Sequence, residues 1–126
     1  MRKILLLLTF IASMFLFTSC KQSVEGYQKI TPQEAKSIID NEQDYIILDV
    51  RRLDEYNNGH IPNAIVIPNE VLSEQAESIL TNKDQLILVY CRSGKRSKEA
   101  ALKLISLGYT NVKDFGGIID WPYEIE

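Results

Sequence analysis

Residues 86–108 decide the fold, and they read LILVYCRSGKRSKEAALKLISLG. The first five residues form a short, continuous apolar run rich in branched side chains, which favours a strand buried on both faces over a helix. Residues 97–107 carry apolar side chains at helical spacing and Gly108 supplies a stop signal, so this part predicts an amphipathic helix. Residues 91–97 therefore join the carboxyl end of a buried strand to the start of a helix.

The same alternation of strand and helix continues on both sides of this segment. Further strands are expected at 45–50, 64–67 and 111–115, and further helices or helical turns at 31–41, 54–56 and 71–80. Thr31 followed by Pro32 and Glu34 is typical of a helix start. The alternation predicts an α/β domain with a central, mostly parallel sheet of about five strands and helices on both faces. In such sheets, ligands bind beyond the carboxyl ends of the strands.

Cys91 stands at such a carboxyl end, and the residues after it suit a reactive thiolate. Gly94 allows a positive φ, which lets the following backbone amides curl around the sulfur. The start of the next helix and the cations Arg92, Lys95 and Arg96 place positive charge nearby. These features favour thiolate over thiol and attract an anionic substrate. The alternative is a buried, inert structural cysteine beside a solvated basic turn.

The cysteine and histidine content predicts no metal site and no cofactor. The chain has two cysteines, Cys20 and Cys91, and one histidine, His60, so no cluster has the spacing of metal ligands. No Cys-x-x-Cys motif is present, which disfavours a thioredoxin-like dithiol. The formal net charge is −3 and no basic tract occurs, so nucleic acid is not expected as a partner.

Residues 1–19 have the layout of a secretory signal peptide. Arg2 and Lys3 form a short cationic start, and the almost wholly apolar stretch at 4–17 follows. That stretch is short for a helix that must cross a bilayer core of ~30 Å. The alternatives are an uncleaved membrane anchor and an N-terminal helix of the domain, although a core helix would show polar positions on one face.

The residues ahead of Cys20 resemble a bacterial lipoprotein signal, in which the cysteine becomes the first mature residue and carries the lipid. Phe17 departs from this pattern, because leucine is usual three positions before the cysteine. The resemblance implies export to the cell envelope and a lipid anchor at Cys20 facing the periplasm, with a plain signal peptide cut nearby as the alternative. We expect a tether at 20–28 and the folded domain at 29–126.

The domain resembles the rhodanese family from Thr31 to about Tyr123. Residues 91–97 (CRSGKRS) look like the family's active-site loop, Cys-Arg-x-Gly-x-Arg-Ser. The other motifs that carry the resemblance are LDVR at 48–51, EY at 55–56, GHIPNA at 59–64, IP at 67–68, and Gly116-Gly117 followed by Trp121. Asn63 departs from the glycine that the family usually has at this turn.

The resemblance implies a thiosulfate sulfurtransferase-like enzyme that acts through a persulfide on Cys91. The thiolate takes sulfane sulfur from thiosulfate or a similar small anionic donor, and a thiol or cyanide then accepts it. The residues implied in donor binding are Arg92, Ser93, Gly94, Lys95, Arg96 and Ser97. Asp49 and Arg51 are expected to support the loop, while His60 and Trp121 are expected to be structural.

Two other functions fit parts of the sequence. A cysteine phosphatase or arsenate reductase would use a similar cradle, but those loops place arginine six positions after the cysteine, where this chain has Ser97. A non-catalytic binding module of the cell envelope is the second alternative, because some rhodanese-like domains lack the cysteine. Here Cys91 and its basic loop are both present, which favours the enzyme.

Overall fold

The computed structural model describes residues 23–126. The predicted signal peptide at 1–19 and the predicted lipid site at Cys20 lie outside the described residues. The elements, in chain order, are β1 (Tyr27–Lys29), α1 (Pro32–Asn41), β2 (Tyr45–Asp49), α2 (Leu53–Asn57), β3 (Ile65–Val66), the 3₁₀ turn η1 (Asn69–Val71), α3 (Leu72–Ile79), β4 (Leu86–Cys91), α4 (Lys95–Ser106), β5 (Val112–Gly117) and the 3₁₀ turn η2 (Ile118–Asp120).

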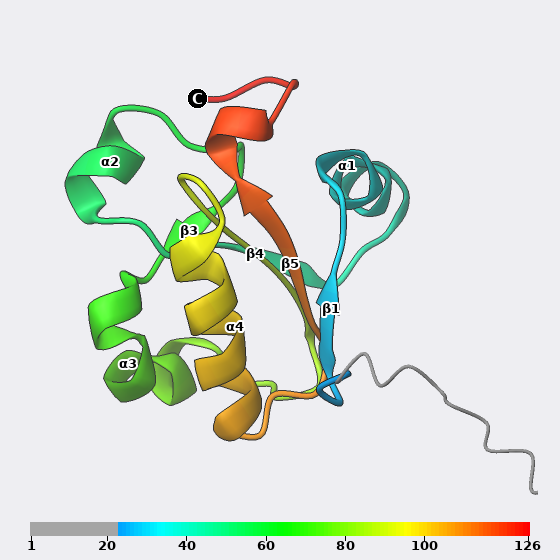
Figure 1. The fold of residues 1–126 in the computed structure, drawn as a ribbon, viewed down its shortest axis with the longest axis vertical. Helices are drawn as coiled ribbons and strands as arrows, with labels where there is room; N and C mark the ends of the chain where they lie inside the picture. The colour runs from blue at the N-terminus through cyan, green and yellow to red at the C-terminus, as the bar shows by residue number, and fades with distance from the viewer. Residues whose placement is uncertain (1–22) are drawn as a thin grey trace, which may run out of the picture.

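The described strands form one five-stranded sheet in the order β1-β5-β4-β2-β3, and every pair is parallel. β4 is the central strand, between β5 and β2 (Figure 1). This arrangement confirms the predicted α/β architecture with a parallel sheet of about five strands. The carboxyl ends of β4 and β5 lie side by side, because Cys91 is in register with Gly117.

The helices cover both faces of the sheet, as predicted. α1 lies on one face, and α3 and α4 lie on the other (Figure 1). Side chains alternate along β4, because successive residues of a strand point to opposite faces. Val89 and Cys91 join the cluster beneath α3 and α4, whereas Leu88 and Tyr90 join the cluster beneath α1.

The domain begins at β1, two residues earlier than expected. Tyr27 pairs with Val112 of β5, and its hydroxyl donates to a carboxylate oxygen of the buried Asp114 at 3.1 Å. β1 has three residues, none of them buried, so it carries no apolar run that could reveal it. Backbone pairing with β5 forms this strand, and residues 27 and 28 therefore belong to the sheet.

Two boundaries near the loop also differ from expectation. α4 begins at Lys95, two residues before the expected start, because Gly94 adopts a φ of +105° and starts the helix directly. β5 runs on to Gly117 through two glycines that predict no strand. The start of α1 is as expected, since Thr31 and Glu34 form a reciprocal capping box.

Among residues 23–126, no helix combines the length and the apolar character needed to cross a bilayer.

Candidate active site

Cys91 ends β4 and its side chain turns into the loop that follows. The residue is 1% exposed, and its Sγ accepts a hydrogen bond from the backbone N–H of Gly94 at 3.0 Å. Gly94 reaches this position with a left-handed φ that a residue with a Cβ rarely adopts. The amino end of the twelve-residue α4 follows at once, so its partial positive charge lies beside the loop.

The loop backbone crosses directly over Gly117. A Cβ atom at this position would clash with the carbonyl of Arg92 and lie 2.6 Å from the Cα of Ser93. Gly117 itself has an extended backbone, with φ −120°, so close approach and not backbone conformation requires glycine here. Just beyond β5, the N–H of Ile119 donates to the same Arg92 carbonyl at 3.2 Å.

The Ser97 side chain stabilises the loop through hydrogen bonds to the loop itself and to β5. It is fully buried, and its hydroxyl lies 3.1 Å from the carbonyl oxygen of Gly94 and 3.3 Å from that of Gly116. Gly116 is in turn fixed by the buried Asp114, whose carboxylate accepts the Gly116 N–H at 3.0 Å. The sequence grouped Ser97 with the residues that bind a donor, but the structure places it where it braces the loop against β5.

The cations of the loop separate into two groups. Arg92 and Lys95 are exposed, as is Ser93, and among residues 23–126 no ion pair involves either cation. Arg96 instead donates two hydrogen bonds to the carboxylate of Glu55, at 2.7 and 3.0 Å. The free positive charge beside Cys91 is therefore carried by Arg92 and Lys95.

The Arg96–Glu55 pair joins α4 to α2. Its hydrogen bonds lower the pKa of the Glu55 carboxyl to about 2 and raise the pKa of the Arg96 guanidinium. Glu55 belongs to the EY motif at 55–56 that carries part of the family resemblance, and the motif alone predicts no role for it. The two residues lie 41 positions apart, so no local pattern connects them.

Asp49 and Arg51 form a buried network at the end of β2, next to β4. The guanidinium of Arg51 donates to the Asp49 carboxylate at 2.7 Å and to the carbonyl of Gly59 at 2.7 Å. The Tyr90 hydroxyl donates to Asp49 at 2.7 Å and accepts the Ile61 N–H at 3.1 Å. Burial raises the pKa of the Tyr90 phenol and the adjacent carboxylate raises it further. This network ties β2, β4 and the segment before β3 together.

His60 is placed for a structural role. Its ring stacks on Tyr56 with centroids 3.8 Å apart, and its Nδ1 lies 2.9 Å from the Tyr56 carbonyl. Among the described residues, no group of three or more histidine, cysteine or acidic side chains is placed to hold a metal ion.

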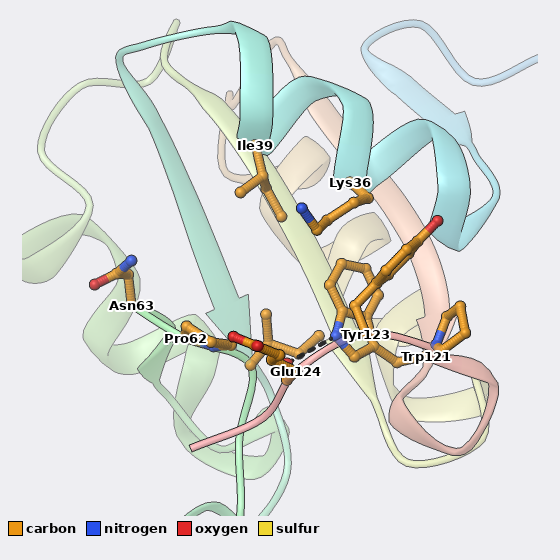
Figure 2. A pocket seen from close by; sticks show the side chains of 9 residues that line it. Lys36, Ile39, Pro62, Asn63, Trp121, Tyr123 and Glu124 are labelled. Atoms are coloured by element: carbon orange, nitrogen blue, oxygen red, sulfur yellow. Dashed lines mark hydrogen bonds between the residues drawn. The ribbon is translucent and has the colours of Figure 1, made fainter.

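Two clefts have residues of the loop in their walls. One of about 410 Å³ has Arg92 in its wall, and another of about 330 Å³ has Ser93 and Gly116 in its wall. A larger cleft of about 650 Å³ lies between α1 and the C-terminal segment, and Trp121 lines it (Figure 2). No residue of the 91–97 loop lines this larger cleft. Trp121 is 9% exposed and packs against Phe115, so it is also part of the core.

The arrangement as a whole presents one sulfur atom, one amide donor and two free cations at the end of a parallel sheet. The amide and the cations can stabilise negative charge on the sulfur and on a small anion beside it. The sulfur can therefore act as a nucleophile toward an anionic compound.

Comparison with known proteins shows that residues 31–122 match the rhodanese-like domain family. The chain is 33% identical to the adenylyltransferase and sulfurtransferase UBA4 of Candida albicans, over 78% of this chain and 24% of that protein, so it spans about a quarter of the fungal protein. It is 33% identical to thiosulfate sulfurtransferase 18 of Arabidopsis thaliana, over 79% of this chain and 80% of that one. It also matches the solved structure of a rhodanese with anions from E. coli, with a TM-score of 0.61 and 30% sequence identity. This match covers 65% of this chain and 96% of the E. coli chain.

Replacing Gly117 tests the crossing of the loop over β5. In Gly117→Ala, the new methyl group displaces the backbone of Arg92 and Ser93, so we expect lower stability, by about 1–3 kcal/mol, and altered thiol reactivity of Cys91. Urea unfolding and the rate of alkylation by iodoacetamide measure the two effects. Lys113→Ala, on the same strand, is the control and should change neither. Wild-type stability and reactivity in Gly117→Ala would contradict the close crossing.

Replacing Glu55 tests the ion pair through its pH dependence. Because the carboxyl has a pKa of about 2 in the folded protein against 4.5 ordinarily, the pair stabilises the fold above pH 4.5 and loses its effect as the pH falls toward 2. We expect Glu55→Gln to lower the free energy of unfolding by about 1–3 kcal/mol at neutral pH, with a deficit that shrinks in acid. Urea unfolding across this range measures it, and Glu74→Gln is the exposed control. A deficit independent of pH would rule out the charge effect.

Proposed function

Because the chain belongs to the rhodanese-like domain family, we propose that it is a sulfurtransferase that carries sulfur on Cys91. The observation that supports this most directly is the hydrogen bond from the Gly94 N–H to the Cys91 Sγ, on a loop where Arg92 and Lys95 make no ion pair with any residue of 23–126. A persulfide at Cys91 is an anion, and amide donors stabilise an anion in a fixed position.

In the first step, the Cys91 thiolate attacks the outer sulfur of thiosulfate. A new S–S bond forms at Sγ, the S–S bond of thiosulfate breaks, and sulfite leaves with the electron pair. Arg92 and Lys95 are the residues that hold the oxyanion of the donor. Arginine suits a two-point contact with such a group, and lysine acts as a point charge.

In the second step, a thiol or cyanide attacks the outer sulfur of the persulfide. The Cys91 Sγ leaves as the thiolate, which restores the starting state. Both steps are nucleophilic displacements at sulfur that balance without an electron carrier or a metal, so the proposed reaction requires no cofactor. The name of the Arabidopsis relative, a thiosulfate sulfurtransferase, supports thiosulfate as the donor.

Phosphoryl or arsenate chemistry fits the loop less well. The position six residues after Cys91 is occupied by Ser97, which is buried and bonded to backbone carbonyls. The arginine one position earlier, Arg96, is held by Glu55. A tetrahedral phosphoryl group would therefore lack the arginine that such a cradle needs.

The larger cleft favours a second candidate function, a non-catalytic binding module. Trp121, Tyr123 and Pro62 line this cleft together with Lys36 and Ile39 of α1, and the Lys36 ammonium lies 5.4 Å from the centre of the Tyr123 ring (Figure 2). Aromatic and proline side chains around a groove are a common feature of surfaces that bind other molecules. This function does not use Cys91, so a cysteine variant separates the two candidates.

We also propose that the protein is exported and held at the cell envelope by a lipid on Cys20. The cationic start, the short apolar stretch and the cysteine after it support this proposal. Acyl chains would add membrane affinity of ~0.8 kcal/mol for each buried CH₂ group. The domain would then meet its donor and acceptor outside the cytoplasm.

Cys91→Ala tests the sulfurtransferase. With the full chain, we expect sulfur transfer from thiosulfate to cyanide in the wild type and only the background rate in the variant. Mass spectrometry after treatment with thiosulfate alone should show a gain of one sulfur atom that the variant lacks. Arg92→Ala and Lys95→Ala should each lower kcat/KM by ~10- to 100-fold, because each removes a charge-assisted contact.

Lys98→Ala is the matched control for these two variants, because Lys98 is an exposed cation of α4 beyond the loop. It should keep the wild-type kcat/KM. A folded wild-type protein with neither turnover nor sulfur gain would exclude thiosulfate transfer and leave the binding function.

Cys20→Ser tests the anchor. In a bacterial host, we expect the wild-type protein in the membrane fraction, labelled by a radioactive or clickable fatty acid, and the variant without label. Cell fractionation and the fatty-acid label measure this. If the wild-type protein is exported and cleaved but carries no fatty-acid label, the segment acts as a plain signal peptide instead.

A further inference from the structure

β5 carries a bulge next to Cys91. Val89 pairs with Asp114, but Cys91 pairs with Gly117, so two steps along β4 match three steps along β5. Gly116 lies within this irregular stretch and has a left-handed φ of +87°, which glycine adopts at no steric cost. Because of the bulge, Gly117 and not Gly116 lies opposite the cysteine.

The Asp114 side chain closes this bulge. Its Oδ1 accepts the N–H of Gly116 at 3.0 Å, two residues further along the chain, as the carboxylate of an Asx turn does. Asp114 is 1% exposed. Val112, two residues earlier, belongs to the same core cluster as Cys91, so the Asp114 side chain points to the face of the sheet on which Cys91 lies.

Two residues of β1 hold the carboxylate of Asp114 in place. The Tyr27 hydroxyl donates to its Oδ2 at 3.1 Å, and the Lys29 ammonium lies 3.7 Å from its Oδ1. Burial, together with the charge and the hydrogen bond of Asp114, raises the pKa of the Tyr27 phenol to about 12, so the phenol remains a donor at neutral pH. Donors and a cation around both oxygens suit an ionised carboxylate, which can only accept hydrogen bonds.

A chain of hydrogen bonds continues from the bulge to the sulfur. The hydroxyl of Ser97 lies 3.3 Å from the carbonyl oxygen of Gly116 and 3.1 Å from that of Gly94. The N–H of Gly94 then donates to the Cys91 Sγ at 3.0 Å. The amide that stabilises negative charge on the sulfur is therefore connected to the bulge through one buried side chain.

Resting on the proposed function, we propose that Asp114 is a positioning residue for sulfur transfer. Its carboxylate fixes the bulge of β5, and through Ser97 the bulge holds the Gly94 N–H against the sulfur of Cys91. The thiolate and the persulfide are both anions at this sulfur, and a donor stabilises an anion best when it is already held in position. Loss of the carboxylate should therefore make Cys91 less reactive, although Asp114 touches no substrate.

Two variants of Asp114 separate its hydrogen bond from its charge. Asp114→Ala removes the acceptor of the Gly116 N–H, whereas Asp114→Asn keeps an oxygen in the same position without the charge. The rate of alkylation by iodoacetamide is measured against pH in the full chain, by mass spectrometry of the peptide that contains Cys91. We expect the midpoint of this profile to rise by about one pH unit in Asp114→Ala, which lowers the alkylation rate at neutral pH by up to about tenfold. Asp114→Asn should stay within about threefold of the wild-type rate.

The charge of Asp114 acts on the profile in the opposite direction. A negative charge near the thiolate disfavours it, so an effect of charge alone would move the midpoint to lower pH in both variants. Sulfur transfer from thiosulfate to cyanide gives a second measurement. In Asp114→Ala we expect kcat to fall about tenfold and KM to change by less than about twofold, because Arg92 and Lys95 are unaltered.

Tyr109→Phe is the matched control for a loss of stability. The buried Tyr109 hydroxyl donates to the carbonyl of Leu80 at 2.6 Å, and Tyr109 follows the carboxyl end of α4, away from the loop. This variant should unfold at lower urea concentration but keep the alkylation profile and kcat. If Asp114→Ala does not fold, Tyr27→Phe replaces it, because it removes one donor to the Asp114 carboxylate. It should slow alkylation at neutral pH by about twofold or more.

The outcomes separate this inference from the function on which it rests. A wild-type alkylation profile in Asp114→Ala, or in its substitute Tyr27→Phe, would overturn the inference alone. A lower midpoint in both Asp114 variants, or an equal change in Tyr109→Phe, would overturn it too, because charge or general stability would then explain the effect. Absence of transfer in the wild type would overturn the sulfurtransferase, while alkylation, which needs no transfer, would still decide whether Asp114 positions Cys91.

Discussion

The close contact between the loop after Cys91 and the backbone of Gly117 constrains the whole site. β4 and β5 are parallel neighbours, and the chain that leaves β4 passes close to Gly117 at the end of β5. A side chain at Gly117 would occupy the space of the Arg92 carbonyl, so only glycine lets the loop backbone pack this closely against β5. In the same region Cys91 is buried and the N–H of Ile119 donates to the Arg92 carbonyl. Backbone packing against Gly117 and the hydrogen bonds of the Ser97 hydroxyl together hold the loop in place.

The ion pairs around the loop decide which charges face a ligand. Arg96 is drawn to Glu55 on α2, so it stabilises the contact between α2 and α4. Arg92 and Lys95 remain exposed beside the cysteine. Of the three cations at positions 92–96, only Arg96 forms an ion pair among the described residues, with the carboxylate of Glu55. Arg92 and Lys95 therefore remain available to a ligand. Free charge attracts an anion more strongly than charge already neutralised by a partner.

The Cys91 loop and a neighbouring cleft lie at the same end of the domain, and different segments build them. The amide of Gly94 and the amino end of α4 stabilise negative charge on sulfur, on the side where β4 turns into the helix. The wall of the neighbouring cleft includes Ile118 and Ile119 of η2 and Ile125 of the C-terminal segment. Ile119 is bonded to the loop through its backbone N–H, which donates to the Arg92 carbonyl.

The sequence by itself determined the alternation of strands and helices, the position of Cys91 at the end of a buried strand, and the basic loop after it. These features are local, since apolar periodicity, caps and glycines act over a few residues. The tertiary structure alone decided that Tyr27–Lys29 forms an edge strand, that Ser97 is buried beneath the loop, and that Glu55 holds Arg96. Each of these depends on groups that are distant along the chain, and only the packing of β1, β4 and β5 with α2 and α4 brings such groups within hydrogen-bonding distance.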